Sequence, residues 1–298
     1  MDKTAWISSL EAIPLGLYEK ALPVDLSWKD RLVLTRQTGF DFLEISIDDT
    51  DERIARLEWS SAERKTLRNL MGHTGVKIQS LSLSAHRRFP LGSKSAKTQK
   101  KAQEIFKRAI DLAVDLGVRY LLVGGAEDYY QEVNQDSRNR FLENLGEGFK
   151  WASGSGVMLA LENWDIQINT MPRVMEYVNY FNSPWFQSYA DLGNLIFAGV
   201  DVVSQLSYVE GHIAALHVKD TLPGQLRYVT PGEGAVPFVE AFEKLALMGF
   251  QAPIVLELWT EEYPDAVELV REGGAFIKDR MIEGWQRAEQ KRITKVIP

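Results

Sequence analysis

The chain has 298 residues, a formal net charge of -7 at pH 7 and no cysteine, which excludes disulfide bonds, thiolate catalysis and cysteine-based zinc sites. Its acidic balance argues against general attraction to nucleic acid. Because no apolar run is long enough to cross a bilayer and the N-terminus lacks the apolar core of a signal peptide, we expect a cytoplasmic protein without a membrane partner.

Strand-like and helix-like segments alternate along the chain. Apolar runs of strand length are each followed by a segment with apolar residues at helical spacing, most clearly in residues 102–116. The predicted strands are Ile13–Tyr18, Phe40–Ile47, Lys77–Ser84, Tyr120–Gly124, Met158–Trp164, Phe186–Leu192, Ile213–Val218 and Ile254–Trp259. The last helix is predicted to run roughly from Pro264 to Glu283.

Glycines mark the ends of the predicted helices. A glycine that follows a helix and precedes a strand is typical of a left-handed cap. The candidates are Gly39, Gly75, Gly117, Gly156, Gly211 and Gly249. Eight strand–helix units in a chain of this length predict an α/β fold, a single (β/α)₈ TIM barrel. We expect one domain over residues 1–298, with short appendages at 1–12 and 290–298.

Four successive strand-like runs in the second half each stop at an ionisable residue. The runs MLALENWD, FQSYADLG, IAALHVKD and PIVLELW contain Glu162, Asp191, His217 and Glu257 at these positions. A buried strand does not favour an unpaired charge at its end unless that end opens onto a site. In a barrel the carboxyl ends of all strands face the same side, so these four residues are predicted to meet there.

Three carboxylates and one imidazole form an oxygen-rich donor set. Such a set suits Mn²⁺, Mg²⁺ or Co²⁺ and is acceptable to Zn²⁺, so the residue types predict a divalent metal without selecting one. Taken singly, a strand-end Glu can instead pair with a lysine or cap a helix, and a His can be a hydrogen-bonded core residue. The joint occurrence at four consecutive strand ends favours a shared metal site.

The segments LALEN, YADLGN, HVKD and LELW resemble the metal-binding strand ends of the xylose-isomerase-like sugar isomerase and epimerase barrels. Together with IPLGLYEKAL, DFLEISIDD, LSAHRRFPLGS, GGAEDYY and PGEG, they make nearly the whole chain similar to the L-ribulose-5-phosphate 3-epimerases, also called L-xylulose-5-phosphate 3-epimerases. The resemblance implies metal-dependent inversion at C3 of a ketopentose 5-phosphate, through an enediolate, by a homodimer.

The resemblance also implies residue roles. Glu162 and Glu257 would both bind the metal and transfer the C3 proton, whereas Asp191 and His217 would be metal ligands only. Related free-ketose 3-epimerases carry a His three residues after the metal-binding Asp. This chain has Asn194 there, which can donate a hydrogen bond to the substrate but cannot titrate. Arg227, in LRYVTPGEG, matches a substrate-contacting Arg; the alternative is a solvated loop charge.

A phosphate on the substrate would point toward the loops after the first four strands. The basic cluster His86, Arg87 and Arg88 lies in one of these loops, and Gly124 and Gly125 offer backbone amides that an anion can approach. We therefore predict that these five residues contact the phosphate. The alternative is that the arginine pair is a surface feature.

Other functions on this kind of barrel remain open to different degrees. A three-zinc apurinic-site endonuclease needs many more His ligands and a basic face for the duplex. The four histidines of this chain are too few, so this function is disfavoured. A dehydratase or an aldose–ketose isomerase begins with the same proton abstraction and is distinguished only by its product. A noncatalytic sugar-phosphate binder has no reason to place two carboxylates against one metal.

Overall fold

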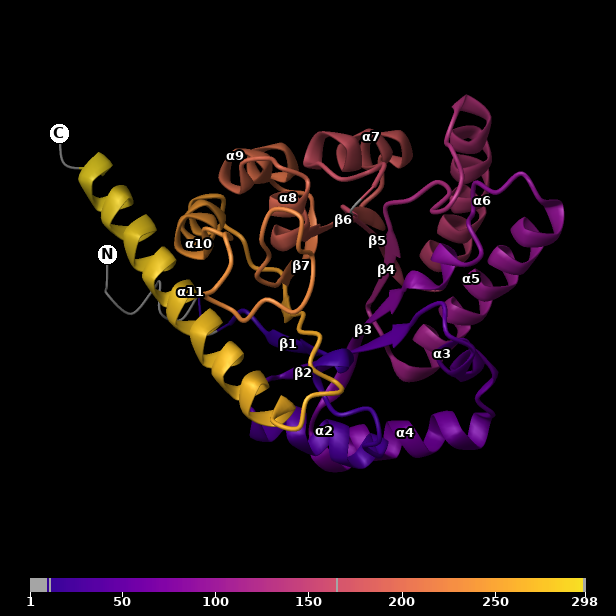
Figure 1. Ribbon diagram of the computed structural model, residues 1–298, viewed down its shortest axis with the longest axis horizontal. Helices are drawn as coiled ribbons and strands as arrows, with labels where there is room; N and C mark the ends of the chain where they lie inside the picture. The colour runs from indigo at the N-terminus through magenta and orange to yellow at the C-terminus, as the bar shows by residue number, and fades with distance from the viewer. Residues whose placement is uncertain (1–9, 11, 165, 297–298) are drawn as a thin grey trace.

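The computed structural model describes residues 10, 12–164 and 166–296. Its strands form one closed parallel barrel, in which each strand pairs with its neighbour in sequence and β8 pairs with β1 (Figure 1). The strands are β1 Leu15–Tyr18, β2 Phe42–Ile47, β3 Lys77–Leu83, β4 Tyr120–Gly124, β5 Met158–Glu162, β6 Phe186–Asp191, β7 Ile213–Val218 and β8 Ile254–Leu256. The predicted (β/α)₈ TIM barrel is confirmed, with strand ends that differ from the predicted ones by at most three residues.

Helices surround the barrel on its outside (Figure 1). The α-helices are α2 Trp28–Gln37, α3 Asp51–Ala55, α4 Ser61–Thr74, α5 Ala96–Leu116, α6 Gln135–Gly154, α7 Met171–Phe181, α8 Leu192–Phe197, α9 Val202–Leu206, α10 Phe238–Leu247 and α11 Ala266–Val296. Short 3₁₀ helices are η1 Glu19–Ala21, η2 Arg56–Glu58, η3 Ser84–Arg87 and η4 Ser207–Val209. None of the described helices is long and apolar enough to span a membrane.

The six glycines predicted to end helices all have positive φ angles, between 72° and 89°. In this region an L-residue with a side chain is strained, so glycine ends the helix at low cost and lets the chain turn back toward the next strand. The cap prediction is confirmed at every position. Each cap determines where the following strand begins. It therefore also determines which residue lies at the C-terminal end of that strand.

The predicted end of the last helix was wrong, because α11 continues past Glu283 to Val296. Gly284 is not a stop signal: a Cβ atom there would lie 2.6 Å from Cβ of Phe242, so the glycine allows α11 to pack closely on α10. Beyond it, Arg292 donates to the carbonyl of Ala246. Residues 290–296 of the expected appendage are thus the last turns of α11, and residues 1–9, 11 and 297–298 lie outside the described residues.

The barrel interior is filled by side chains of the strands. A separate apolar layer lies between the strands and the helices. The interior group comprises Tyr18, Phe42, Leu122, Ala160, Tyr189, Ala214, Ala215 and Val255. Gly16 leaves room for this interior group, because a Cβ atom on Gly16 would lie 2.3 Å from the Phe42 ring. The interior is therefore a packed core, and the open end for a site is at the strand C-termini.

Candidate metal centre and substrate pocket

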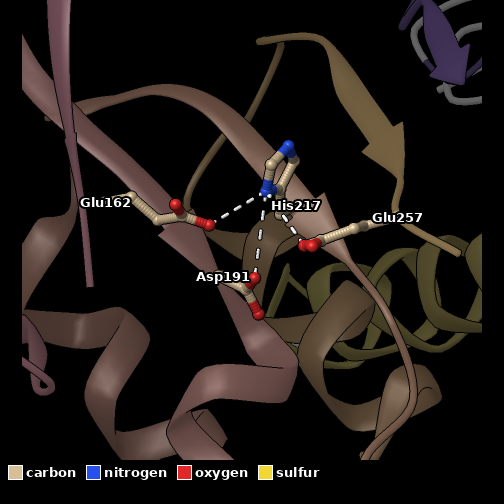
Figure 2. Close-up of side chains that lie close together, drawn as sticks. All are labelled: Glu162, Asp191, His217 and Glu257. Carbon is tan, nitrogen blue, oxygen red and sulfur yellow. Dashed lines mark hydrogen bonds and ion pairs between the residues drawn. The ribbon is translucent and has the colours of Figure 1, made fainter. Parts of the chain in front are cut away.

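Glu162, Asp191, His217 and Glu257 lie within one residue of the C-terminal ends of the neighbouring strands β5, β6, β7 and β8, and all four are buried. One ligand atom from each lies within 4.8 Å of the others. Figure 2 shows the three carboxylates arranged around the His217 ring, with Glu162 and Glu257 on opposite sides. His217 Nδ1 is 3.0 Å from Glu162 Oε1, 3.3 Å from Glu257 Oε2 and 3.8 Å from Asp191 Oδ2.

Each of the two glutamates is held by a tryptophan through one carboxylate oxygen. Trp164 Nε1 donates to Glu162 Oε2 at 2.6 Å, and Trp259 Nε1 donates to Glu257 Oε1 at 3.1 Å. The second oxygen of each glutamate is the one that faces His217 Nδ1. Because each indole fixes one oxygen, the other is presented to the centre of the site in a defined direction.

Asp191 is held in a similar way, but by the backbone. It is the N-cap residue of α8, and its Oδ1 accepts a hydrogen bond from the backbone N–H of Asn194 at 2.8 Å. Oδ2 is left to face His217 and forms an ion pair with Lys219; among the described residues it has no hydrogen-bond partner. The Asn194 side chain donates to the Asn163 carbonyl at 2.7 Å, while its Oδ1 is buried without a described partner.

The imidazole of His217 is oriented from behind by Glu44 of β2. His217 Nε2 lies 2.7 Å from Glu44 Oε1, and Glu44 Oε2 accepts hydrogen bonds from Tyr189 and Ser80. Glu44 is fully buried. Nε2 donates its proton to Glu44, so Nδ1 is the nitrogen that faces the three carboxylates. Burial alone would lower the pKa of His217, but Glu44 and Glu162 outweigh it and raise that pKa well above its ordinary value.

Lys219 adds a cation beside the four residues. Its Nζ lies 2.9 Å from Asp191 Oδ2 and 2.9 Å from Glu257 Oε2. Burial alone would lower the pKa of Lys219, but Asp191 and Glu257 outweigh it and raise that pKa, so the side chain stays charged. Burial raises the pKa of Asp191 to about 7. For Glu257, the attraction of Lys219 and His217 outweighs burial and lowers the pKa to about 2.

These donors fit a divalent cation. Three carboxylate oxygens and one imidazole nitrogen face a common point, and every ligand side chain has its remaining polar atom bound by a protein group. Such outer contacts orient ligands in metal sites, and the donor types suit Mn²⁺, Mg²⁺, Co²⁺ or Zn²⁺. The buried cluster can therefore hold a metal ion, while the role of each ligand stays a prediction.

Glu162, His217 and Glu257 line a pocket whose volume is about 540 Å³, including space open to solvent. Its lining includes Tyr18, Lys20, Asp48, Ser82, Ser84, Arg87, Glu162, Trp164, Asn194, His217, Lys219, Leu226, Arg227, Glu257 and Trp259. Most of its lining side chains are polar or charged, which suits a small polar ligand. Of the predicted substrate-contacting residues, it brings together Asn194, Arg87 and Arg227.

Each tryptophan that holds a glutamate also carries an arginine on its ring. The Arg87 guanidinium lies 4.8 Å from the centre of the Trp164 ring, and the Arg227 guanidinium lies 3.8 Å from that of Trp259. Both arginines also line the outer mouth of the pocket. Within the described part of the chain, neither forms an ion pair with a carboxylate, and Arg87 Nε is buried without a hydrogen-bond partner. Two arginines are thus positioned for an anion.

The other predicted phosphate contacts do not line this pocket. His86 turns toward α5, with Nε2 3.2 Å from the Ala102 carbonyl and its ring against Phe106. Its burial lowers the pKa of His86 to about 4. Arg88 lies on the surface, where it pairs with Asp51 at 2.6 Å. The 3₁₀ turn of η3 points the side chains of His86, Arg87 and Arg88 in different directions. Of these three, only Arg87 lines the pocket.

Gly124 and Gly125 lie at the end of β4, where their missing side chains make room for protein atoms. A Cβ atom on Gly124 would lie 1.9 Å from the Trp164 ring. A Cβ atom on Gly125 would lie 2.4 Å from the Glu162 carbonyl oxygen. The two glycines allow β5 and its tryptophan to pack against β4, and neither lines the pocket.

The sequence interpretation missed several residues that hold the site. A signal was present in the spacing, because residues two apart in an extended strand point to the same side. Each of three strand ends has a second functional side chain at this distance: Glu162 with Trp164, His217 with Lys219, and Glu257 with Trp259. Lys20 and Asp48, which pair at 2.6 Å in the pocket wall, had no such signal.

Comparisons with known proteins agree with this architecture. The family model described as xylose isomerase-like TIM barrel matches residues 32–280. L-ribulose-5-phosphate 3-epimerase UlaE of Escherichia coli O1:K1 is 44% identical over 270 residues, which cover 90% of this chain and 95% of that protein. The UlaE protein of Escherichia coli O157:H7 matches with the same identity and coverage. The chain belongs to the L-ribulose-5-phosphate 3-epimerase family. The expectation of an isomerase-class enzyme is thereby confirmed.

More distant solved structures share the fold. D-psicose 3-epimerase from Clostridium cellulolyticum H10 aligns with a TM-score of 0.72 and 17% identity, over 93% of this chain and 99% of that one. The IOLI protein, solved with a bound zinc atom, aligns with a TM-score of 0.73 and 21% identity, over 93% of this chain and 99% of that one. These two likenesses support the barrel fold alone.

Proposed function

We propose that this enzyme catalyses the metal-dependent 3-epimerisation of a ketopentose 5-phosphate, interconverting L-xylulose 5-phosphate and L-ribulose 5-phosphate. The name of the UlaE relatives supports the substrate class. The observation that carries the reaction type is the placement of Glu162 and Glu257 on opposite sides of the site, each with one oxygen fixed by a tryptophan and the other facing the centre. Inversion of a carbon needs a proton acceptor on one face and a proton donor on the other.

The reaction begins with removal of the C3 proton next to the C2 ketone. A divalent ion held by Glu162, Asp191, His217 and Glu257 would supply positive charge against the negative charge that develops on the oxygens of the enediolate. One glutamate takes the proton from its face of C3, and the other returns a proton to the opposite face. The indole N–H groups of Trp164 and Trp259 hold the two carboxylates in position during these transfers.

The remaining residues of the site have supporting roles in this proposal. Asp191 and His217 bind the metal and do not transfer protons to the substrate. Asn194 lines the pocket and presents a buried amide oxygen without a described partner, which suits contact with a substrate hydroxyl group. Because an amide does not titrate, Asn194 orients the substrate without acting as an acid or base.

Arg87 and Arg227 are proposed to bind the phosphate. Both line the inner pocket as well as its outer mouth, and both are supported by an aromatic ring instead of a carboxylate. A guanidinium group is suited to bidentate contact with phosphate oxygens. His86, Arg88, Gly124 and Gly125 are left out of this proposal because they do not line the pocket. The homodimer and the cytoplasmic location stay predictions.

The test is incubation of metal-loaded protein with either sugar phosphate in deuterated water, with products followed by NMR. We expect both pentulose phosphates to form, with deuterium at C3. Glu162→Gln and Glu257→Gln should each stop net epimerisation and differ in which epimer still exchanges its C3 hydrogen. An aldose product would indicate an aldose–ketose isomerase, and loss of water a dehydratase. Near wild-type interconversion by either variant with metal bound contradicts the two-glutamate mechanism.

A further inference from the structure

Lys219 contacts two residues of the metal centre and has no role in the proposed reaction. We propose that Lys219 is a built-in second cation of this centre, which shares two carboxylate oxygens with the metal, stabilises the metal-free fold and limits metal affinity. The inference rests on the proposed metal site and adds to it. Lys219 would then set how firmly the metal is retained, without being a ligand itself.

The contacts of Lys219 are with the ligand oxygens that face the centre. Its Nζ lies 2.9 Å from Glu257 Oε2 and 2.9 Å from Asp191 Oδ2. The same two oxygens lie 3.3 Å and 3.8 Å from His217 Nδ1, so they are the ones a metal would take. The other oxygen of each carboxylate is already bound by a protein N–H group. Ammonium and metal must therefore share these two oxygens.

The charges of the centre explain why such a cation is needed. Four buried carboxylates surround His217: Glu44, Glu162, Asp191 and Glu257. A divalent ion neutralises two of these charges, and Lys219 neutralises one more. An uncompensated charge is costly in a buried site. Without Lys219, the carboxylates would repel each other most strongly in the metal-free protein.

The fold reserves the path of the Lys219 side chain. Gly193 of α8 lies directly beside it, and a Cβ atom on Gly193 would be 2.5 Å from Lys219 Cγ. Thr221 holds Gly193 in this position, because the Thr221 hydroxyl donates a hydrogen bond to the Gly193 carbonyl at 2.8 Å. The lysine is only 7% exposed at its side chain. Its ammonium group is therefore held at the two carboxylates by packing as well as by charge.

The ammonium group of Lys219 opposes binding of a metal cation to the same oxygens of Asp191 and Glu257. Binding of the metal must weaken or share the charge-assisted hydrogen bond from Lys219 to Glu257 and its ion pair with Asp191. Such contacts make an appreciable net contribution, so their removal from the metal-free state should raise metal affinity about 10- to 100-fold. The same removal leaves the metal-free protein with more carboxylate repulsion and a lower Tm. Both effects make the stabilisation by metal larger in a variant without the lysine.

The experiment uses Lys219→Met, with Lys20→Met as the matched control. Lys20 is also a buried lysine of the pocket wall, but it pairs with Asp48 at 2.6 Å and with none of the metal ligands. Each protein is stripped of metal and titrated with Zn²⁺ against a competing chelating dye, and its Tm is measured with and without Zn²⁺. We expect tighter Zn²⁺ binding and a larger Zn²⁺-induced rise in Tm for Lys219→Met only.

Where Lys219→Met does not stay folded without metal, the loaded protein is mixed with excess chelator and the rate of Zn²⁺ loss is followed. A slower loss than from wild type supports the proposal. Equal or weaker Zn²⁺ binding by Lys219→Met, or an equal gain by Lys20→Met, overturns it while leaving the metal centre intact. Failure of the wild-type protein to bind any divalent ion overturns the metal centre itself, and the inference with it.

Discussion

Glu44 and His217 meet inside the barrel, where Glu44 Oε1 lies 2.7 Å from His217 Nε2 although the two residues are 173 positions apart in the sequence. The contact joins β2 to β7 across the barrel interior. It fixes the ring so that Nδ1 faces the carboxylates at the ends of β5, β6 and β8. The orientation of the imidazole that is proposed to bind the metal thus depends on a residue that would not touch the metal.

Replacement of Glu44 by glutamine should therefore weaken metal binding without removing a ligand. Loss of such an outer partner typically costs about 10- to 100-fold in metal affinity. Competitive titration with Zn²⁺ measures the effect, and activity at saturating metal should largely return. Ser80→Ala is the control, because it removes a hydrogen bond to Glu44 and leaves the contact with His217 in place. Unchanged affinity in Glu44→Gln contradicts the orienting role.

Removal of the metal should abolish activity, and addition of Mn²⁺, Co²⁺, Mg²⁺ or Zn²⁺ should restore it to differing degrees. His217→Ala and Asp191→Asn should both purify with little metal, as elemental analysis would show. Asp191→Ala adds a second defect, because it also removes the N-cap of α8, which costs about 1 kcal/mol of stability. Full turnover by metal-free protein, or an unaltered metal content in these variants, contradicts the assignment.

The phosphate proposal predicts unequal effects at two neighbouring arginines. Arg87→Ala should raise KM for the sugar phosphate by about 10- to 100-fold, since a hydrogen bond to a charged group contributes about 1.5–3 kcal/mol. It should affect the unphosphorylated ketose much less. Arg88→Ala should leave both substrates nearly unchanged, because Arg88 is turned to the surface beside Asp51. Equal losses on both substrates for Arg87→Ala remove the phosphate role from this loop.

His86 should make the fold sensitive to mild acid. Its pKa is lowered from an ordinary 6.5 to about 4, because burial disfavours the charged ring. At pH values between about 4 and about 6.5, the unfolded chain binds a proton that the folded chain does not. The free energy of unfolding therefore falls as the pH drops from about 6.5 to about 4, and His86 causes no further fall below that pH. The full effect is about 3 kcal/mol. His86→Leu should show a smaller fall than wild type in urea unfolding compared at pH 7.5 and 4.5; parallel falls contradict this assignment.

The strand ends and the helix caps were the predictable part of the structure, because each depends on local pattern. An apolar run that stops at Glu162 or His217 is visible in the sequence, and so is a glycine after a helical stretch. The barrel follows from the repetition of these units, and the convergence of the four residues follows from the barrel.

The residues that hold the ligands were not predictable in the same way. Glu44 lies in a run that reads as an ordinary buried strand, and its partner is on a strand far away in sequence. His86, Arg87 and Arg88 are consecutive, and only the backbone turn of η3 decides which of them faces the pocket. The predicted contact of the Gly124 amide with an anion stays a prediction, and the role of its missing side chain in making room for the Trp164 ring has no signal in the sequence. These outcomes depend on three-dimensional packing.

Trp164 and Trp259 give the pocket two similar halves, since each indole has an arginine on its ring and a glutamate on its N–H group. For an epimerase this similarity of the two halves matters for both the forward and the reverse reaction, because the product of one reaction is the substrate of the other. The two halves differ at Lys219, whose Nζ lies 2.9 Å from Glu257 Oε2 and, within the described part of the chain, makes no such contact with Glu162. The two indoles also connect the phosphate end of the pocket to the reacting carbon, so a sugar that lacks the phosphate should lose turnover as well as affinity.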